Sequence, residues 1–76
     1  MGPLYKVNVT IRIEKQRSTS FGKIVQDLRT AGLTDVAMHQ RLLVVNGSVA
    51  NDRIDDLRNI DGVASVREDA TYKAQD

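Results

Sequence analysis

The sequence predicts an α+β domain in which four strands form one antiparallel sheet and two helices cover one face of that sheet. Residues 5–14 alternate apolar and polar side chains, which is typical of a strand with one buried face. Two later segments, 19–31 and 51–60, carry apolar residues at helical spacing. Apolar runs bounded by turn residues lie between and after them, at 35–49 and 63–72. The expected element order is therefore β-α-β-β-α-β.

The first strand, residues 5–14, has the clearest pattern in the chain. Its alternation places two sets of side chains on opposite faces of a sheet. The apolar set is Tyr5, Val7, Val9, Ile11 and Ile13, and the polar set is Lys6, Asn8, Thr10 and Arg12. We expect the apolar face to be buried and the polar face to contact water, as in an open sheet that is covered on one side.

The first helix is expected at residues 19–31, after a polar connector in which Ser18 and Ser20 are candidate N-caps. Its apolar stripe consists of Phe21, Ile24, Val25, Leu28 and Ala31. Gly32 follows the helix and is expected to adopt the left-handed conformation, with Leu33 packing back on the last turn.

The hairpin that follows has two candidate turns. Asn46-Gly47 is a strong two-residue hairpin signal, but a turn there leaves too few residues to pair before the next helix. A turn near residues 40–41 instead gives strands at 35–40 and 42–49, and this is the arrangement that we predict. Gly47 then lies inside a strand, where glycine indicates a bulge or close packing under a helix.

The second helix is short. Asn51 is a candidate N-cap, and Ile54 and Leu57 give the helix a buried side. Residues 61–62, Asp-Gly, are expected to end it.

The last strand is expected at residues 63–72, with Ala64 and Val66 on its buried face. With this strand the order matches the ferredoxin-like fold, and we expect residues 1–76 to form a single domain of that kind.

Composition argues against several classes of function. Eleven Lys plus Arg residues balance ten Asp plus Glu residues, and both signs are scattered along the chain, unlike the concentrated basic surface of a nucleic-acid-binding protein. The absence of cysteine excludes disulfides, zinc–thiolate sites and thiol catalysis. No apolar run approaches the roughly 20 residues that span a bilayer. We therefore expect neither a nucleic acid nor a membrane as a partner.

The residues that could carry catalysis are few. His39 is the sole histidine, and we expect it to be a half-exposed strand residue without a catalytic role. Asp52, Asp55 and Asp56 resemble a cation-binding cluster, but they fall on one exposed side of a helix and are better explained as a solvated face. We expect no enzymatic activity, no metal and no cofactor.

The most specific pattern lies in residues 47–72. A strand of small residues leads into a short helix with Ile54 and Leu57 in its core, and then to a break at residues 61–62. The strand Val-Ala-Ser-Val-Arg-Glu-Asp follows, at residues 63–69. This segment resembles the second half of the subtilisin propeptide and inhibitor I9 family. The first half of the chain agrees with that family only in its strand and helix pattern.

The resemblance implies a way of binding a subtilisin-type serine protease. Family members dock the open face of their sheet on two surface helices of the protease, and their C-terminal tail enters the active-site cleft. In this chain the docking face would present Leu42, Val44, Asn46 and Ser48, if Val45, Gly47 and Val49 point inward. The acidic pair Glu68 and Asp69 would approach the N-termini of the protease helices, where unsatisfied N–H groups favour negative charge.

The resemblance also assigns roles to the tail. Tyr72 would fill an apolar subsite of the protease, Lys73 would point outward, Ala74 would fit a constricted subsite, and Gln75 would occupy the primary pocket. Asp76 is one residue more than this register needs, so a shift by one residue stays open.

Two functions are compatible with these residues. The first is a propeptide-like inhibitor or folding assistant of a subtilisin-type protease, acting without cofactors and monomeric when free. The alternative is a small regulatory or self-associating ferredoxin-like domain that has no protease partner.

Overall fold

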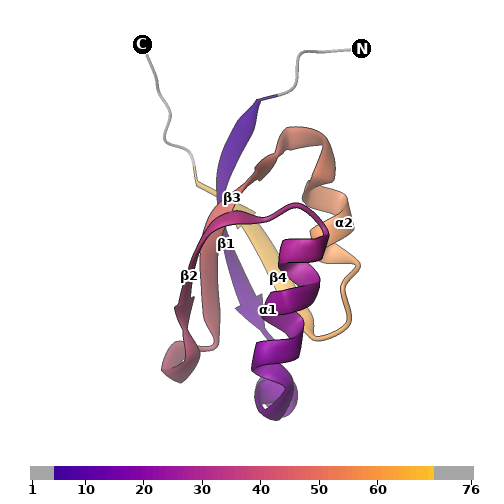
Figure 1. The fold of residues 1–76 in the computed structure, drawn as a ribbon. Helices are drawn as coiled ribbons and strands as arrows, with labels where there is room; N and C mark the ends of the chain where they lie inside the picture. The colour runs from indigo at the N-terminus through magenta and orange to yellow at the C-terminus, as the bar shows by residue number, and fades with distance from the viewer. Residues whose placement is uncertain (1–4, 70–76) are drawn as a thin grey trace.

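Two helices cover one face of a four-stranded antiparallel sheet in the structure, a computed structural model that describes residues 5–69 (Figure 1). The strand order is β2-β3-β1-β4, and every neighbouring pair is antiparallel. The predicted α+β, ferredoxin-like class is therefore confirmed. Along the chain the elements are β1 (Lys6–Ile13), η1 (Lys15–Ser20), α1 (Phe21–Thr30), β2 (Thr34–His39), η2 (Gln40–Leu42), β3 (Val44–Ala50), η3 (Asn51–Arg53), α2 (Ile54–Arg58) and β4 (Val63–Glu68).

Strand β1 lies in the middle of the sheet, between β3 and β4. Val9, Ile11 and Ile13 are buried, as their alternation with polar residues predicts. The expectation that Tyr5 shares this buried face is wrong, because its side chain is 60% exposed. Pairing with β3 begins at Lys6, so Tyr5 lies before the sheet and beyond its core.

The first helix is shorter than its apolar stripe suggests. The predicted range 19–31 is divided, because the polar residues before Phe21 form the 3-10 helix η1 and the α-helix begins at Phe21. Ser20 holds the N-cap position of α1, without a side-chain capping bond. The buried side of α1 consists of Phe21, Ile24, Val25 and Leu28.

The end of α1 is as predicted. Gly32 has φ of +117°, and its N–H donates to the carbonyl of Arg29 at 3.0 Å. The N–H of Leu33 donates to the carbonyl of Leu28, also at 3.0 Å, and the Leu33 side chain is buried. These two bonds are those of a Schellman motif, which satisfies the last carbonyls of the helix and directs the chain back toward the sheet.

Strands β2 and β3 are joined by η2, so the turn near residues 40–41 is confirmed. Gly47 is buried inside β3, and β2 has a register irregularity opposite it, between Thr34 and Ala37. A Cβ at Gly47 would lie 2.8 Å from Cγ of Leu33 and 2.8 Å from the backbone oxygen of Thr34. The expected close packing is therefore present, but it is against the segment that enters β2 and not under a helix. The register irregularity lies on β2, opposite Gly47.

Asn51 does not cap the second helix. It is the first residue of η3, and Arg53 holds the N-cap position of α2. The side-chain oxygen of Asn51 accepts a hydrogen bond from the N–H of Tyr5 at 3.2 Å, and its own N–H donates to the Tyr5 carbonyl at 2.9 Å. Its polar groups therefore connect η3 to the residue before β1.

Strand β4 contains a bulge that the alternation of apolar and polar residues does not indicate. Ser65 pairs with Arg12 but Val63 pairs with Ile13, so Ala64 is an additional residue on β4. Val66 is buried as predicted, whereas Ala64 is exposed and the prediction for it is wrong. The part of the predicted strand after residue 69 lies outside the described residues.

The core lies between the two helices and one face of the sheet (Figure 1). Within residues 5–69 it contains no buried polar or charged side chain. It consists of Val9, Ile11, Ile13, Phe21, Ile24, Val25, Leu28, Leu33, Val45, Val49, Ile54, Leu57 and Val66. Because both helices pack on this face, the opposite face of the sheet has no element of residues 5–69 over it.

Candidate functional site

The face of the sheet opposite the helices is the candidate site, and we call it the open face. Its members follow from the strand register, since directly paired residues project to the same side. They are Lys6, Asn8, Thr10 and Arg12 of β1, Thr34, Ala37 and His39 of β2, Val44, Asn46, Ser48 and Ala50 of β3, and Ser65 and Arg67 of β4.

Strand β3 supplies the centre of the open face in the register that was predicted. Val45, Gly47 and Val49 are buried, so Val44, Asn46 and Ser48 project to the open face. The latter side chains are only half-buried. The predicted positions of Val44 and Asn46 on this face are thus confirmed.

Leu42 is not on the open face. It is exposed, as expected, with 70% of its surface accessible, but it belongs to η2, at the end of the sheet. Strand β3 begins at Val44, after Leu43 has taken a left-handed conformation with φ of +55°. This reversal of the backbone removes Leu42 from the alternation that its neighbours on β3 follow.

A chain of hydrogen bonds joins polar side chains across three strands of the open face. Ser48 donates through Oγ to Oδ1 of Asn8 at 2.8 Å. Lys6 donates through Nζ to Oγ1 of Thr34 at 3.0 Å, and that hydroxyl donates to the Ser48 carbonyl at 3.2 Å. Bonds of this kind hold small polar side chains in one arrangement on the strands.

Glu68 and Asp69 project to opposite sides of the sheet. Glu68 is paired with Val9, whose side chain is in the core, so Glu68 is exposed at the margin of the helix-covered face. Asp69 lies at the open face, where its Oδ1 accepts a hydrogen bond from Oγ1 of Thr10 at 3.3 Å. Its N–H donates to the Asn8 carbonyl at 2.8 Å. Asp69 lines a depression together with Asn46, whereas Glu68 lines another together with Val44.

The remaining predicted site residues, Tyr72, Lys73, Ala74, Gln75 and Asp76, lie outside the described residues.

The open face is hollowed at two adjoining places. One depression has a volume of about 400 Å³, and Asn8, Asn46, Ser48 and Asp69 are among the residues that line it. The other has a volume of about 670 Å³ and extends past the edge strand β4 to α2. Its lining consists of Thr10, Arg12, Val44, Arg58, Ser65, Val66, Arg67 and Glu68. Thr10 lines both depressions.

Asn8 and Thr10 were not among the predicted binding residues, although they line these depressions. The signal that could have found them is the polar half of the alternation in β1, because β1 is a central strand and its outward side chains occupy the middle of the face.

The residues considered for catalysis or metal binding are not assembled into a site. His39 is exposed, and its Nε2 lies 3.3 Å from Nδ2 of Asn46. Asp55 and Asp56 form ion pairs with Arg58 and Arg53 on the surface of α2, which agrees with a solvated face. Within residues 5–69, no group of three or more His, Cys, Asp or Glu residues is arranged to hold a metal ion.

No helix in the described part of the chain is both long enough and apolar enough to span a membrane. Comparisons of the chain with family models, with curated proteins and with solved structures found no match.

Proposed function

We propose that this protein is a propeptide-like inhibitor or folding assistant of a subtilisin-type serine protease. The open face docks on the protease, and the residues after Asp69 enter the active-site cleft and block it. The observation that carries this proposal is the position of Asp69. It is hydrogen-bonded to Thr10 on the open face, so the chain leads from that face into the tail.

The character of the open face supports docking on a helical protein surface. Its centre consists of short side chains on β1 and β3, such as Asn8, Asn46 and Ser48, which allow another surface to approach closely. Val44 adds a half-buried apolar group. Apolar groups surrounded by satisfied polar ones are typical of a protein interface that forms and dissociates.

The divergence of the acidic pair refines the proposal. Asp69 is the carboxylate that would approach the N-terminus of a protease helix, because it lies on the open face. Glu68 projects to the other side and would remain at the rim. Beyond them, Tyr72, Ala74 and Gln75 would occupy protease pockets while the backbone of the tail adds hydrogen bonds to an edge of the protease.

Inhibition of a subtilisin-type protease by the intact chain and by a chain that ends at Asp69 tests the proposal. We expect the intact chain to inhibit competitively and the shortened chain to lose most of this inhibition. Absence of inhibition by an intact chain that survives the protease would contradict the proposal.

A pair of matched variants tests the docking face separately from the tail. Ser48→Arg places a long side chain on the open face, and Gln26→Arg places the same side chain on the exposed side of α1. We expect only Ser48→Arg to weaken inhibition. Equal inhibition by the two variants would argue against docking through the open face.

The edge strand β2 favours the alternative, a self-associating domain without a protease partner. Met38 on this edge is 54% exposed and borders a depression of about 460 Å³ beside α1. Pairing of β2 with β2 of a second copy would cover that side chain. A molecular mass that rises with protein concentration, together with a lack of protease inhibition, would favour this alternative.

A further inference from the structure

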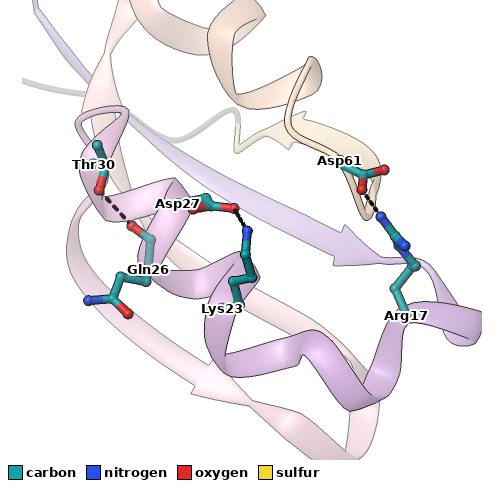
Figure 2. Close-up of polar contacts among 6 residues, drawn as sticks. All are labelled: Arg17, Lys23, Gln26, Asp27, Thr30 and Asp61. Atoms are coloured by element: carbon teal, nitrogen blue, oxygen red, sulfur yellow. Dashed lines mark hydrogen bonds and ion pairs between the residues drawn. The ribbon is translucent and has the colours of Figure 1, made fainter.

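The positive charges of this protein differ in whether they have a carboxylate partner. On the helix side, Arg17 pairs with Asp61, and Lys23 pairs with Asp27 at 3.2 Å (Figure 2). Arg53 and Arg58 are likewise paired, with Asp56 and Asp55. Most of the charge on this side of the molecule is therefore compensated, although Arg29 of α1 has no carboxylate partner among residues 5–69.

Three cations at one end of the sheet have no such partner. Arg12 ends the polar row of β1, Lys15 begins η1, and Arg41 lies in η2. All three are exposed, and none has a carboxylate oxygen of residues 5–69 within 4.0 Å. We call this group, together with Leu42, the basic end.

The fold holds the basic end together from two segments that are distant in the sequence. The N–H of Ile13 donates to the carbonyl of Leu43 at 2.8 Å, which fixes the end of β1 against the residue after η2. The result is a depression of about 490 Å³ whose lining includes all three cations and Leu42. Glu14 also lines it, so three cations share this hollow with one carboxylate.

Leu42 gives the basic end an apolar contact. Its side chain is the most exposed large hydrophobic one within residues 5–69, at 70%, and Leu43 and Ala64 line the same depression. An exposed leucine beside uncompensated cations offers a partner both an apolar contact and charge attraction.

We propose that the basic end binds an acidic protein segment that carries an apolar side chain. Carboxylates of the segment pair with Arg12, Lys15 and Arg41, and its apolar side chain packs on Leu42. A protein segment fits better than a single-stranded nucleic acid, because none of the residues that line this depression is an aromatic on which a base could stack.

The basic end lies at the opposite end of β4 from Asp69. Strand β4 begins beside the basic end, at Val63 opposite Ile13, and runs away from it toward Asp69 (Figure 1). A partner on the basic end could therefore be bound independently of the tail residues. The proposal does not depend on the protease being the partner.

The test is an NMR titration that follows the backbone amides of the intact protein. The probe is the peptide acetyl-Glu-Glu-Leu-Glu-Glu-amide, and the matched control peptide has serine in place of each glutamate. We expect the acidic peptide to shift amides of residues 12–15 and 40–43 at low salt, and to lose most of this effect at about 0.5 M salt. The serine peptide should cause no comparable shifts.

Two double variants with the same loss of charge locate the site. Arg12→Gln with Arg41→Gln removes two cations from the basic end, and Lys6→Gln with Arg29→Gln removes two that lie elsewhere. We expect about tenfold weaker binding for the first pair, in line with the modest strength of exposed ion pairs, and little change for the second. Arg41→Gln alone, in η2, provides a variant that leaves every strand unchanged.

The outcomes distinguish this proposal from nonspecific charge attraction and from nucleic-acid binding. Equal weakening by both double variants, or no localised shifts with the acidic peptide, would overturn it. Tighter binding of a single-stranded RNA of equal charge at the same amides would also overturn it, in favour of a nucleic acid. A chain that ends at Asp69 should bind the peptide with unchanged affinity, even though it loses most of its protease inhibition. Loss of peptide binding by that chain would show that the two sites are not independent.

Discussion

Replacing Gly47 by alanine tests the close packing between β3 and the segment that enters β2. The new Cβ would lie 2.8 Å from Cγ of Leu33 and from the backbone oxygen of Thr34, well inside the roughly 3.5–4.0 Å of a favourable contact. Leu33 is held by the Schellman motif and Thr34 by its pairing with Ser48, so neither can retreat without moving backbone. Overpacking of this kind costs about 1–3 kcal/mol.

Part of this cost is offset, because glycine in a strand is itself unfavourable by roughly 0.5–1 kcal/mol relative to alanine. We therefore expect Gly47→Ala to lower the free energy of unfolding by about 1–2 kcal/mol. For a domain of this size, that corresponds to a loss of roughly 4–16 °C in Tm. The measurement is urea and thermal unfolding followed by circular dichroism.

Gly22→Ala is the matched control for this substitution. Gly22 is the second residue of α1, and a Cβ there would meet nothing within 4 Å. We expect this variant to gain about 0.5 kcal/mol, because alanine is the better helix former and restricts the unfolded chain. A Gly47→Ala protein as stable as the parent, or a Gly22→Ala protein that is destabilised to the same extent, would contradict the close packing inferred at Gly47.

Two further predictions concern α2 and the turn before β4. Leu57 is fully buried, so Leu57→Ala should lower the free energy of unfolding by about 2–5 kcal/mol. This is a large part of the stability of a small domain. A loss below about 1 kcal/mol in urea unfolding would contradict the prediction. Asp61→Asn removes the partner of Arg17 at an exposed site, and we expect a loss below about 1 kcal/mol at low salt that vanishes near 1 M salt. A loss that does not depend on salt would show that Asp61 acts in some other way.

Features set by local spacing were correctly predicted. Alternation along β1 and β3 indicates which side chains are buried, because successive residues in any strand project to opposite faces. Gly32 marks the end of α1, since a helix that ends in the left-handed conformation favours glycine. Val44 and Asn46 of the candidate site follow from the same alternation, once Val45 is assigned to the core.

The features that were missed depend on partners elsewhere in the chain. Asn51 has the residue type of an N-cap, but its side chain bonds to Tyr5, which is distant in the sequence. Ala64 lies in an apolar alternation, but the bulge that exposes it is defined only by the register with β1. Leu42 continues the pattern of β3, yet the left-handed backbone at Leu43 removes it from the strand.

The element order, the buried half of β1 and β3, and the fold class could all be read from the amino-acid sequence, because they follow from periodicities of two and 3.6 residues along the chain. The contact of Asp69 with Thr10, and the grouping of Arg12 and Arg41 around one exposed leucine, became visible only in the folded chain. Such groupings depend on strand register and on where the chain turns back. Both result from packing between segments that are far apart in the sequence, and no local pattern contains them.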